Sequence, residues 1–221
     1  MKDEKNTAAT AGEVWSIRSG DAEFFGRLST QANIREVTVL HGEGRKSILR
    51  EPALGLICSV QCPGSVVIKT FDAVRELRDA GIVMAGGFHS PMENDCLDFL
   101  LRGIQPVIVC PGKGLAHVRV PQEWSAGIAA GRLLLLSQFD DTVQRTTTAL
   151  AQARNELVAA LSAAVLIPHA SPGGKVEATA RNILERGQPL FTFDDEANTD
   201  LIRQGARPYN LADVKQAVLS A

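Results

Sequence analysis

The sequence has few aromatic residues, almost no excess of one charge and no long apolar segment. Aromatic residues make up 5% of the 221 residues, with one tyrosine, so a platform that stacks many nucleic-acid bases is not expected. A formal net charge of −2 excludes a strongly basic coat for nucleic acids, although it leaves room for a local basic groove. No apolar run approaches the roughly 20 residues of a membrane-spanning helix, and the first residues lack the apolar centre of a secretory signal. We therefore expect a cytoplasmic protein that does not contact a membrane.

Several motifs of familiar enzymes are also missing. There is no complete G-x-G-x-x-G motif and no P-loop, so conventional NAD or ATP binding is not expected. The G-x-S-x-G elbow of serine hydrolases, the H-E-x-x-H zinc motif and a paired-carboxylate motif are absent as well. The residues therefore favour a binding protein over an enzyme, and they predict no cofactor.

The four cysteines do not follow a disulfide or zinc pattern. Cys58 and Cys110 lie in apolar, strand-like runs, where cysteine usually acts as a small apolar side chain. Cys58 and Cys62 are four positions apart, but no second cysteine or histidine pair follows at the spacing of a zinc site. In a cytoplasmic protein all four thiols, including that of Cys96, are expected to stay reduced and to bind no metal.

From about residue 52 onward, short apolar runs alternate with helical patterns. Near-continuous runs of valine, isoleucine and leucine are typical of parallel strands that are covered on both faces. Between them, apolar residues recur at helical spacing, and glycines stand where helices should end. The alternation predicts a doubly wound α/β fold with about six mainly parallel strands and helices on both faces. The predicted strands are Ala53–Val60, Ile82–Ala85, Pro106–Cys110, Leu133–Ser137, Val165–His169 and Leu190–Phe193.

We expect one main domain, residues 52–221, preceded by a tail and extension, residues 1–51. Within the extension, Asp21–Gln31 could form a helix and Val37–His41 a short strand. These residues are too few for an independent core, so they are expected to pack on the sheet of the main domain. At the other end, Leu211–Leu219 is predicted to form a terminal helix.

Ligands of open α/β sheets bind at the carboxyl ends of the strands, and several predicted loops there are rich in glycine. After the second strand, Gly86 and Gly87 are followed by Ser90, Pro91 and Glu93, which is the pattern of a capped helix start. Free backbone N–H groups at that start would favour a phosphate or another anion. The second loop is therefore a predicted anion site.

The loop after the fifth strand repeats this arrangement. Gly173 and Gly174 precede another helix start, and Lys175 adds a full positive charge. Simpler explanations stand beside the anion site, because a glycine pair often makes only a tight turn. In the same way, His89 can be a hydrogen-bonding loop residue, and Glu177 can complement the helix dipole without binding anything.

At these loops the sequence resembles the DNA-processing protein A (DprA, or Smf) family, over roughly residues 52–208. Arg154 and Asn155 open a segment similar to the family's R-N-R-I-I-A-G-L-S, and Leu201–Ala206 is similar to its n-x-L-I-x-x-G-A ending. Ile82–Gly87 is similar to its vvSGgA strand and turn. The resemblance implies a Rossmann-like fold, binding of single-stranded DNA, and homodimers that help to load a recombinase during transformation or repair.

The sequence also departs from this family at two turns. Phe88–Met92 replaces the usual A-R-G-I-D, which removes a basic contact, and Ser171–Glu177 replaces the S-G-x-x-x-T-A turn. The second of these segments is similar to the P-G-G-x-G-T-x-x-E loop of LOG-type, lysine-decarboxylase-like nucleotide phosphoribohydrolases. That resemblance implies the alternative, a nucleotide-binding enzyme with Glu177 as its acid–base group, or a nucleotide-sensing protein.

The sequence thus predicts a protein that binds single-stranded DNA, or a nucleotide, with a role in DNA uptake and recombination. Lys113, Arg154 and Lys175 can neutralise phosphates, and the amide of Asn155 can reach sugars or base edges. No catalytic residue is predicted, apart from Glu177 in the alternative. The full predicted phosphate- and DNA-binding set is Ser59, Gly86, Gly87, His89, Ser90, Lys113, Arg154, Asn155, Ser171, Gly173, Gly174 and Lys175.

Overall fold

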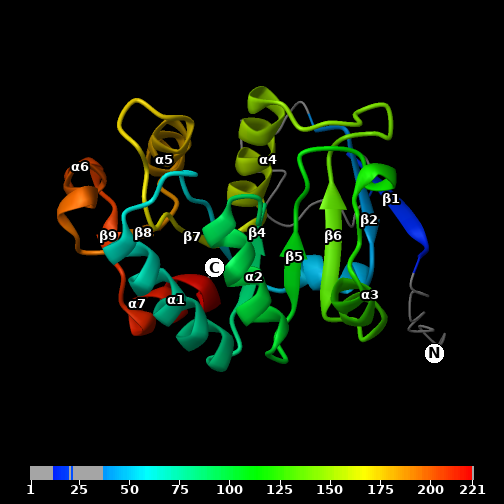
Figure 1. The fold of residues 1–221 in the computed structure, drawn as a ribbon, viewed down its shortest axis with the longest axis horizontal. Coiled ribbons are helices and arrows are strands. Elements are labelled where there is room, and N and C mark those ends of the chain that lie inside the picture. The colour runs from blue at the N-terminus through cyan, green and yellow to red at the C-terminus, as the bar shows by residue number, and fades with distance from the viewer. Residues whose placement is uncertain (1–11, 20, 22–36, 221) are drawn as a thin grey trace.

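The computed structural model describes residues 12–19, 21 and 37–220. Their strands are β1 (Val14–Arg18), β2 (Val39–Glu43), β3 (Ala53–Leu56), β4 (Val83–Gly86), β5 (Val107–Val109), β6 (Leu133–Ser137), β7 (Ala164–Leu166), β8 (Leu190–Thr192) and β9 (Arg207–Pro208). They form one sheet in the order β1-β2-β6-β5-β4-β3-β7-β8-β9 (Figure 1). The strands from β6 to β9 in this order are parallel, whereas β1 and β2 pair antiparallel at one edge.

The predicted mainly parallel α/β sheet is confirmed, but the predicted number of about six strands is wrong. The six apolar runs correspond to β3 through β8, and β1, β2 and β9 extend the sheet to nine strands. The added edge strands carry too few buried residues to show an apolar run. Both residues of β9 are exposed, and Ile17 is the one fully buried residue of β1.

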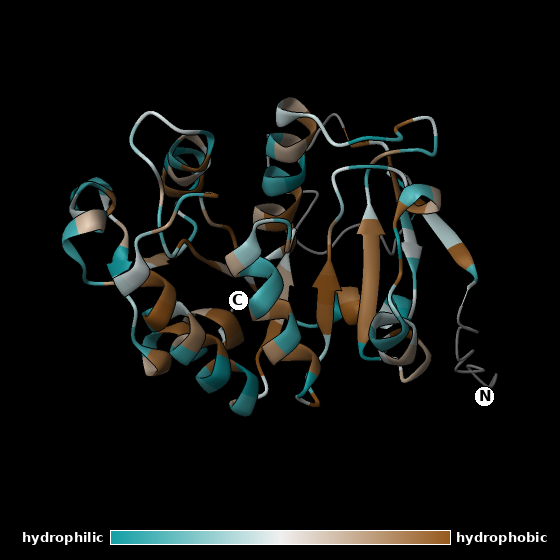
Figure 2. Cartoon of the chain, viewed as in Figure 1, coloured by the Kyte–Doolittle hydropathy of each residue, from teal (hydrophilic) through white to brown (hydrophobic). Residues whose placement is uncertain are grey.

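Helices cover both faces of the sheet. The helices α1 (Gly64–Asp79), α2 (Pro91–Leu101), α3 (Gln122–Ala129) and α7 (Leu211–Leu219) lie on one face, and α4 (Thr148–Leu161), α5 (Lys175–Glu185) and α6 (Thr199–Gln204) lie on the other. In β6, Leu133 and Leu135 pack against the first group, while Leu134 and Leu136 pack against the second. Because both faces are covered, the strands from β3 to β8 are buried at every position and largely apolar, as Figure 2 shows for β5 and β6.

The extension joins the sheet of the main domain. The predicted strand Val37–His41 appears as β2, shifted by two residues, and His41 of β2 pairs with Ser137 of β6. Strands before and after residue 51 thus share one sheet. The domain boundary between residues 51 and 52 stays a prediction. The predicted helix Asp21–Gln31 lies, apart from Asp21, outside the described residues. Within the described ranges, no helix is long and apolar enough to cross a membrane.

Candidate functional site

The chain reverses its direction across the sheet between β3 and β7. From β3 it runs through β4 and β5 to β6, and then returns through α4 to β7 on the other side of β3. Ligands of open α/β sheets bind at such a switch point, because the two loops that follow the neighbouring strands leave toward opposite faces. The candidate site is therefore centred on the β3 loop, residues 57–63, and the β7 loop, residues 167–174.

Hydrogen bonds hold the β3 and β7 loops together. The N–H of Ser171 donates to Oγ of Ser59 at 2.9 Å, and the N–H of Ser59 donates to the carbonyl oxygen of His169 at 3.0 Å. His169 is itself fixed, because its Nδ1 lies 3.1 Å from Oδ1 of the buried Asn198. Two predicted site residues, Ser59 and Ser171, are thus brought together, and they set the spacing between the two loops.

A buried carboxylate occupies the helix start that was predicted to bind an anion. Ser90 caps α2 and forms a capping box with Glu93, as the sequence pattern predicted. The Glu93 carboxylate accepts the N–H groups of His89 and Ser90, each at 3.1 Å, and that of Cys58 at 3.0 Å. Since the N–H groups of His89 and Ser90 already have an acceptor, the expectation that they are free for a ligand is corrected. Glu93 also links α2 to the β3 loop, a long-range contact that local pattern does not reveal.

Arg154 of α4 lies buried beneath the loop that follows β4. Arg154 is only 6% exposed, and its Nε has no hydrogen-bond partner in the described part of the chain. A Cβ atom built on Gly87 would lie 1.5 Å from Nη1 of Arg154, so only glycine leaves room for the guanidinium there. Burial lowers the pKa of Arg154, while the negative charge of Glu93 acts in the opposite direction. Asn155, the next residue, is half-buried.

Gly86 and Phe88 complete this tight turn. Phe88 is buried and has a φ of 45°, which is the left-handed region that non-glycine residues rarely adopt. A Cβ on Gly86 would lie 2.9 Å from the Phe88 ring, so the ring packs directly on the glycine. Backbone conformations of this kind cost about 1–3 kcal/mol and cluster at functional sites.

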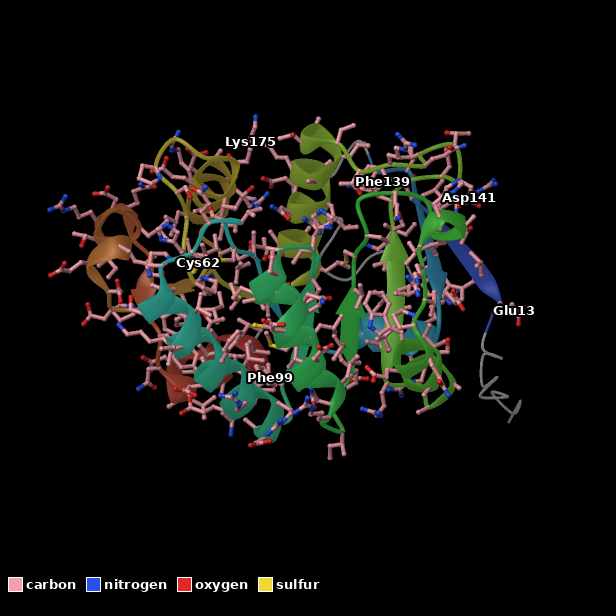
Figure 3. The ribbon with its side chains drawn as sticks, in the orientation of Figure 1. Glu13, Cys62, Phe99, Phe139, Asp141 and Lys175 are labelled. Atoms are coloured by element: carbon pink, nitrogen blue, oxygen red, sulfur yellow. The ribbon has the colours of Figure 1, made fainter. Side chains whose placement is uncertain are left out.

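The β7 loop presents Lys175 at the start of α5. Gly173 has a φ of 68°, and its N–H donates to Oε2 of Glu177 at 2.8 Å. Oε1 of Glu177 accepts a hydrogen bond from Gln204 at 3.3 Å, so both carboxylate oxygens are engaged in fixing the loop. Lys175 is exposed and, among the described residues, forms no ion pair; Figure 3 shows it where the chain enters α5.

Two further cations lie in the loops after β5 and β6. Lys113 is half-buried in the β5 loop, residues 110–114, and Arg145 is exposed in the β6 loop, residues 138–147. The two loops pack together, because the N–H of Gly114 donates to the carbonyl oxygen of Val143 at 2.9 Å. Neither cation has an acidic partner in the ranges that the structure describes. Arg145 was not predicted from the sequence, because the predictions relied on glycine-rich loops and the β6 loop contains no glycine.

A cavity of about 690 Å³ lies elsewhere, beside β1, β2, the β6 loop and α4. It is separate from the switch point between β3 and β7, and none of the predicted site residues lines it. Its polar lining comes from Ser16, Arg18, Thr38, His41, Gln138, Asp140 and Glu156.

Solved structures share this fold. The DNA processing protein A (DprA) from Streptococcus pneumoniae superimposes with a TM-score of 0.78 at 19% identity, over 95% of this chain and 74% of that one. The DNA processing protein A from Helicobacter pylori, described for its single-stranded DNA binding mode, gives a TM-score of 0.74 at 18% identity, over 96% of this chain and 98% of that one. The molybdenum cofactor carrier protein from Chlamydomonas reinhardtii gives a TM-score of 0.53 at 15% identity, over 77% of this chain and 100% of that one. At these identities the likeness shows the fold.

The sequence itself identifies the family. None of the curated proteins compared with the chain matches it. Residues 16–218, which include all nine strands except the first two residues of β1, match the profile of the family described as DNA recombination-mediator protein A. The predicted resemblance is confirmed, and the chain belongs to the DNA recombination-mediator protein A (DprA) family.

Proposed function

We propose that this protein binds single-stranded DNA through its phosphates at the carboxyl edge of the sheet, and that it acts in DNA uptake and recombination. The observation that carries the proposal is Arg154, a buried guanidinium at this edge whose Nε has no partner in the described residues. Buried donors of charged groups normally have a hydrogen-bond partner, so a guanidinium Nε without one at the edge where ligands bind is best explained by an anionic ligand that accepts from it. Membership of the DprA family supports DNA as that ligand.

The arrangement of the strands suggests how a DNA strand would lie. Lys113, Gly87 and Ser59 lie in the loops that follow β5, β4 and β3, and Lys175 lies where the β7 loop enters α5; these four strands are consecutive neighbours in the sheet. Three strand spacings of about 4.8 Å give a row of roughly 14 Å, which is long enough for several phosphates. In this proposal the cations neutralise phosphates, and the amide of Asn155 contacts a sugar or a base edge.

Composition indicates the character of the binding. With a net charge of −2 overall, affinity depends on a few local cations and should fall steeply as salt rises. Few aromatic residues are present to stack on bases, so little preference for sequence is expected. Anisotropy of a fluorescein-labelled oligothymidylate, measured across a salt series, tests the function. Absence of salt-dependent binding at low salt would contradict it.

Lys175→Ala is expected to weaken this binding and to flatten its salt dependence. The loss of one phosphate contact should reduce the slope of log K against log[salt] by about 0.7, the value for single strands. Arg181→Ala is the matched control, since Arg181 is an exposed cation further along α5, away from the loop. An unchanged slope for Lys175→Ala, or an equal change for Arg181→Ala, would remove Lys175 from the site.

We also propose that the protein forms a homodimer and delivers DNA to a recombinase, as the family resemblance implies. Light scattering is expected to give twice the subunit mass of 23.7 kDa at micromolar concentrations. A single-subunit mass across that range would contradict the dimer without affecting the DNA site.

A further inference from the structure

The cavity of about 690 Å³ lies at the same edge of the sheet as the candidate DNA site. Strand β2 runs antiparallel to β6, with His41 opposite Ser137, so the first residues of β2 lie beside the carboxyl end of β6. The β6 loop and α4 supply the rest of the wall on this side: Gln138, Phe139, Asp140, Ala153, Glu156 and Leu157. Ala153 precedes Arg154 in α4, so the cavity adjoins the helix segment that carries the buried guanidinium.

One hydroxyl group joins the cavity to the predicted phosphate contacts. Oγ of Ser137 donates to the carbonyl oxygen of Lys113 at 2.8 Å and accepts the N–H of Phe139 at 3.1 Å. Figure 3 shows Phe139 just beyond the end of β6. Strand β6 follows β5 in the sheet, and β2 follows β6. The cavity therefore extends the row that ends at Lys113 by one or two strand spacings of about 4.8 Å.

The hydrogen-bonding groups that remain free in the cavity are mainly donors. Nε2 of Gln138 is buried and has no acceptor within the ranges that the structure describes. Arg18 is exposed and forms no ion pair with those residues. By contrast, both carboxylate oxygens of Glu156 are engaged, by Asn182 at 3.1 Å and by Arg186 at 3.3 Å. A ligand that fits must therefore bring acceptors and a negative charge.

The second acidic side chain of the cavity limits where that negative charge can lie. Asp140 accepts hydrogen bonds from the N–H of Thr142, at 2.8 Å, and from its hydroxyl. These bonds lower the pKa of Asp140, so a negative charge stays at the β6 loop. Arg18 pairs with Val39 on the far side of β2, two strand spacings or about 10 Å from β6. The anionic part of the ligand therefore belongs at β1, and its neutral part at the β6 loop.

The neutral part must also cover apolar side chains. Val37, Val39 and Leu157 line the cavity together with Phe139. A planar ring packs well on such a wall, because aromatic rings form offset or edge-on contacts with phenylalanine. A nucleobase combines apolar faces with acceptors at its edge, and a nucleotide adds a phosphate. The cavity volume lies within the roughly 300–1,000 Å³ of sites that bind small molecules.

We propose that this cavity binds one nucleotide, with its base against Phe139 and an acceptor of the base edge on Nε2 of Gln138. The phosphate lies at Arg18. A free nucleotide and one unit of a bound DNA strand offer the same chemistry, and the second source rests on the proposed function.

Photo-crosslinking of the full chain tests the position of the base. The probes are 5-iodo-2′-deoxyuridine 5′-monophosphate and an oligothymidylate that carries 5-iodouracil in place of thymine, since this base links to nearby aromatic rings under long-wave ultraviolet light. Phe139 is the one aromatic residue of the tryptic peptide Leu133–Arg145. We expect an adduct on this peptide, and we expect excess thymidine 5′-monophosphate to suppress it. Absence of that adduct with both probes would overturn the site.

Two variants with matched controls test the polar contacts. Gln138→Leu and Arg18→Ala are expected to reduce the yield of the adduct at least threefold. Gln122→Leu and Arg207→Ala should leave it unchanged, because both residues are exposed and lie outside the cavity, on α3 and on the opposite edge strand β9. Equal yields in all four variants would overturn the assigned contacts.

The two probes also separate the two sources of the nucleotide. An adduct with the oligonucleotide alone identifies the ligand as a unit of the DNA strand, and an adduct with the monophosphate alone identifies a free nucleotide. If anisotropy shows no binding of the oligonucleotide, the proposed function fails, whereas the monophosphate still decides whether the cavity binds a nucleotide.

Discussion

Replacing Glu93 with alanine is expected to lower the free energy of unfolding by about 3–5 kcal/mol. Its carboxylate accepts the N–H groups of Cys58, His89 and Ser90, and it is the negative charge that acts on the buried Arg154. Each buried donor left without an acceptor costs about 1–3 kcal/mol, and the guanidinium would lose its counter-charge. Urea unfolding followed by circular dichroism measures the change.

Asp95→Ala is the matched control, because Asp95 lies on the same helix, is exposed and forms no ion pair with the described residues. It is expected to stay within about 0.5 kcal/mol of the wild type. The double variant Glu93→Ala with Arg154→Met should be more stable than Glu93→Ala alone, since the uncompensated charge is gone. A loss below about 1 kcal/mol for Glu93→Ala would show that the carboxylate is replaceable.

The sequence predicted the elements whose signals are local. The apolar run Leu133–Ser137 predicted a buried strand, and all five residues of β6 are buried. Leu211–Leu219 forms the predicted terminal helix. The helix start at Ser90 follows from the capping pattern with Glu93. The two-residue strand β9, Arg207–Pro208, carries no apolar signal, because it is defined only by its pairing with β8.

The candidate site was predictable in position but not in detail. Parallel strands place their loops at one edge, which brought Ser59 and Ser171 together as expected. Gly87 was predicted as part of a phosphate-binding loop, and the structure adds that it makes room for Arg154, 67 positions later in the chain. The reach of Glu93 to Cys58 is equally non-local. Such contacts depend on how α2 and α4 pack, which no spacing in the sequence encodes.

Arg154→Met is expected to weaken binding of single-stranded DNA at least about tenfold, because a charge-assisted hydrogen bond is worth about 1.5–3 kcal/mol. The same change should leave the free energy of unfolding unchanged or raise it. Burying a guanidinium without hydrogen bonds is costly, and an apolar side chain of similar length removes that cost. The three N–H bonds to Glu93 remain, so the start of α2 should stay intact.

Two further variants separate charge from geometry at this position. Arg154→Lys keeps the charge but loses the planar fork that matches a phosphate, so its affinity should fall between those of the wild type and Arg154→Met. Gly87→Ala keeps the arginine but places a Cβ where Nη1 now lies, so the guanidinium must move and binding should weaken. If Arg154→Met instead binds DNA like the wild type and unfolds at lower urea, the arginine supports the fold. The expected combination, in which Arg154 lowers the free energy of unfolding but is needed for DNA binding, indicates that a bound phosphate supplies its missing hydrogen-bond partner.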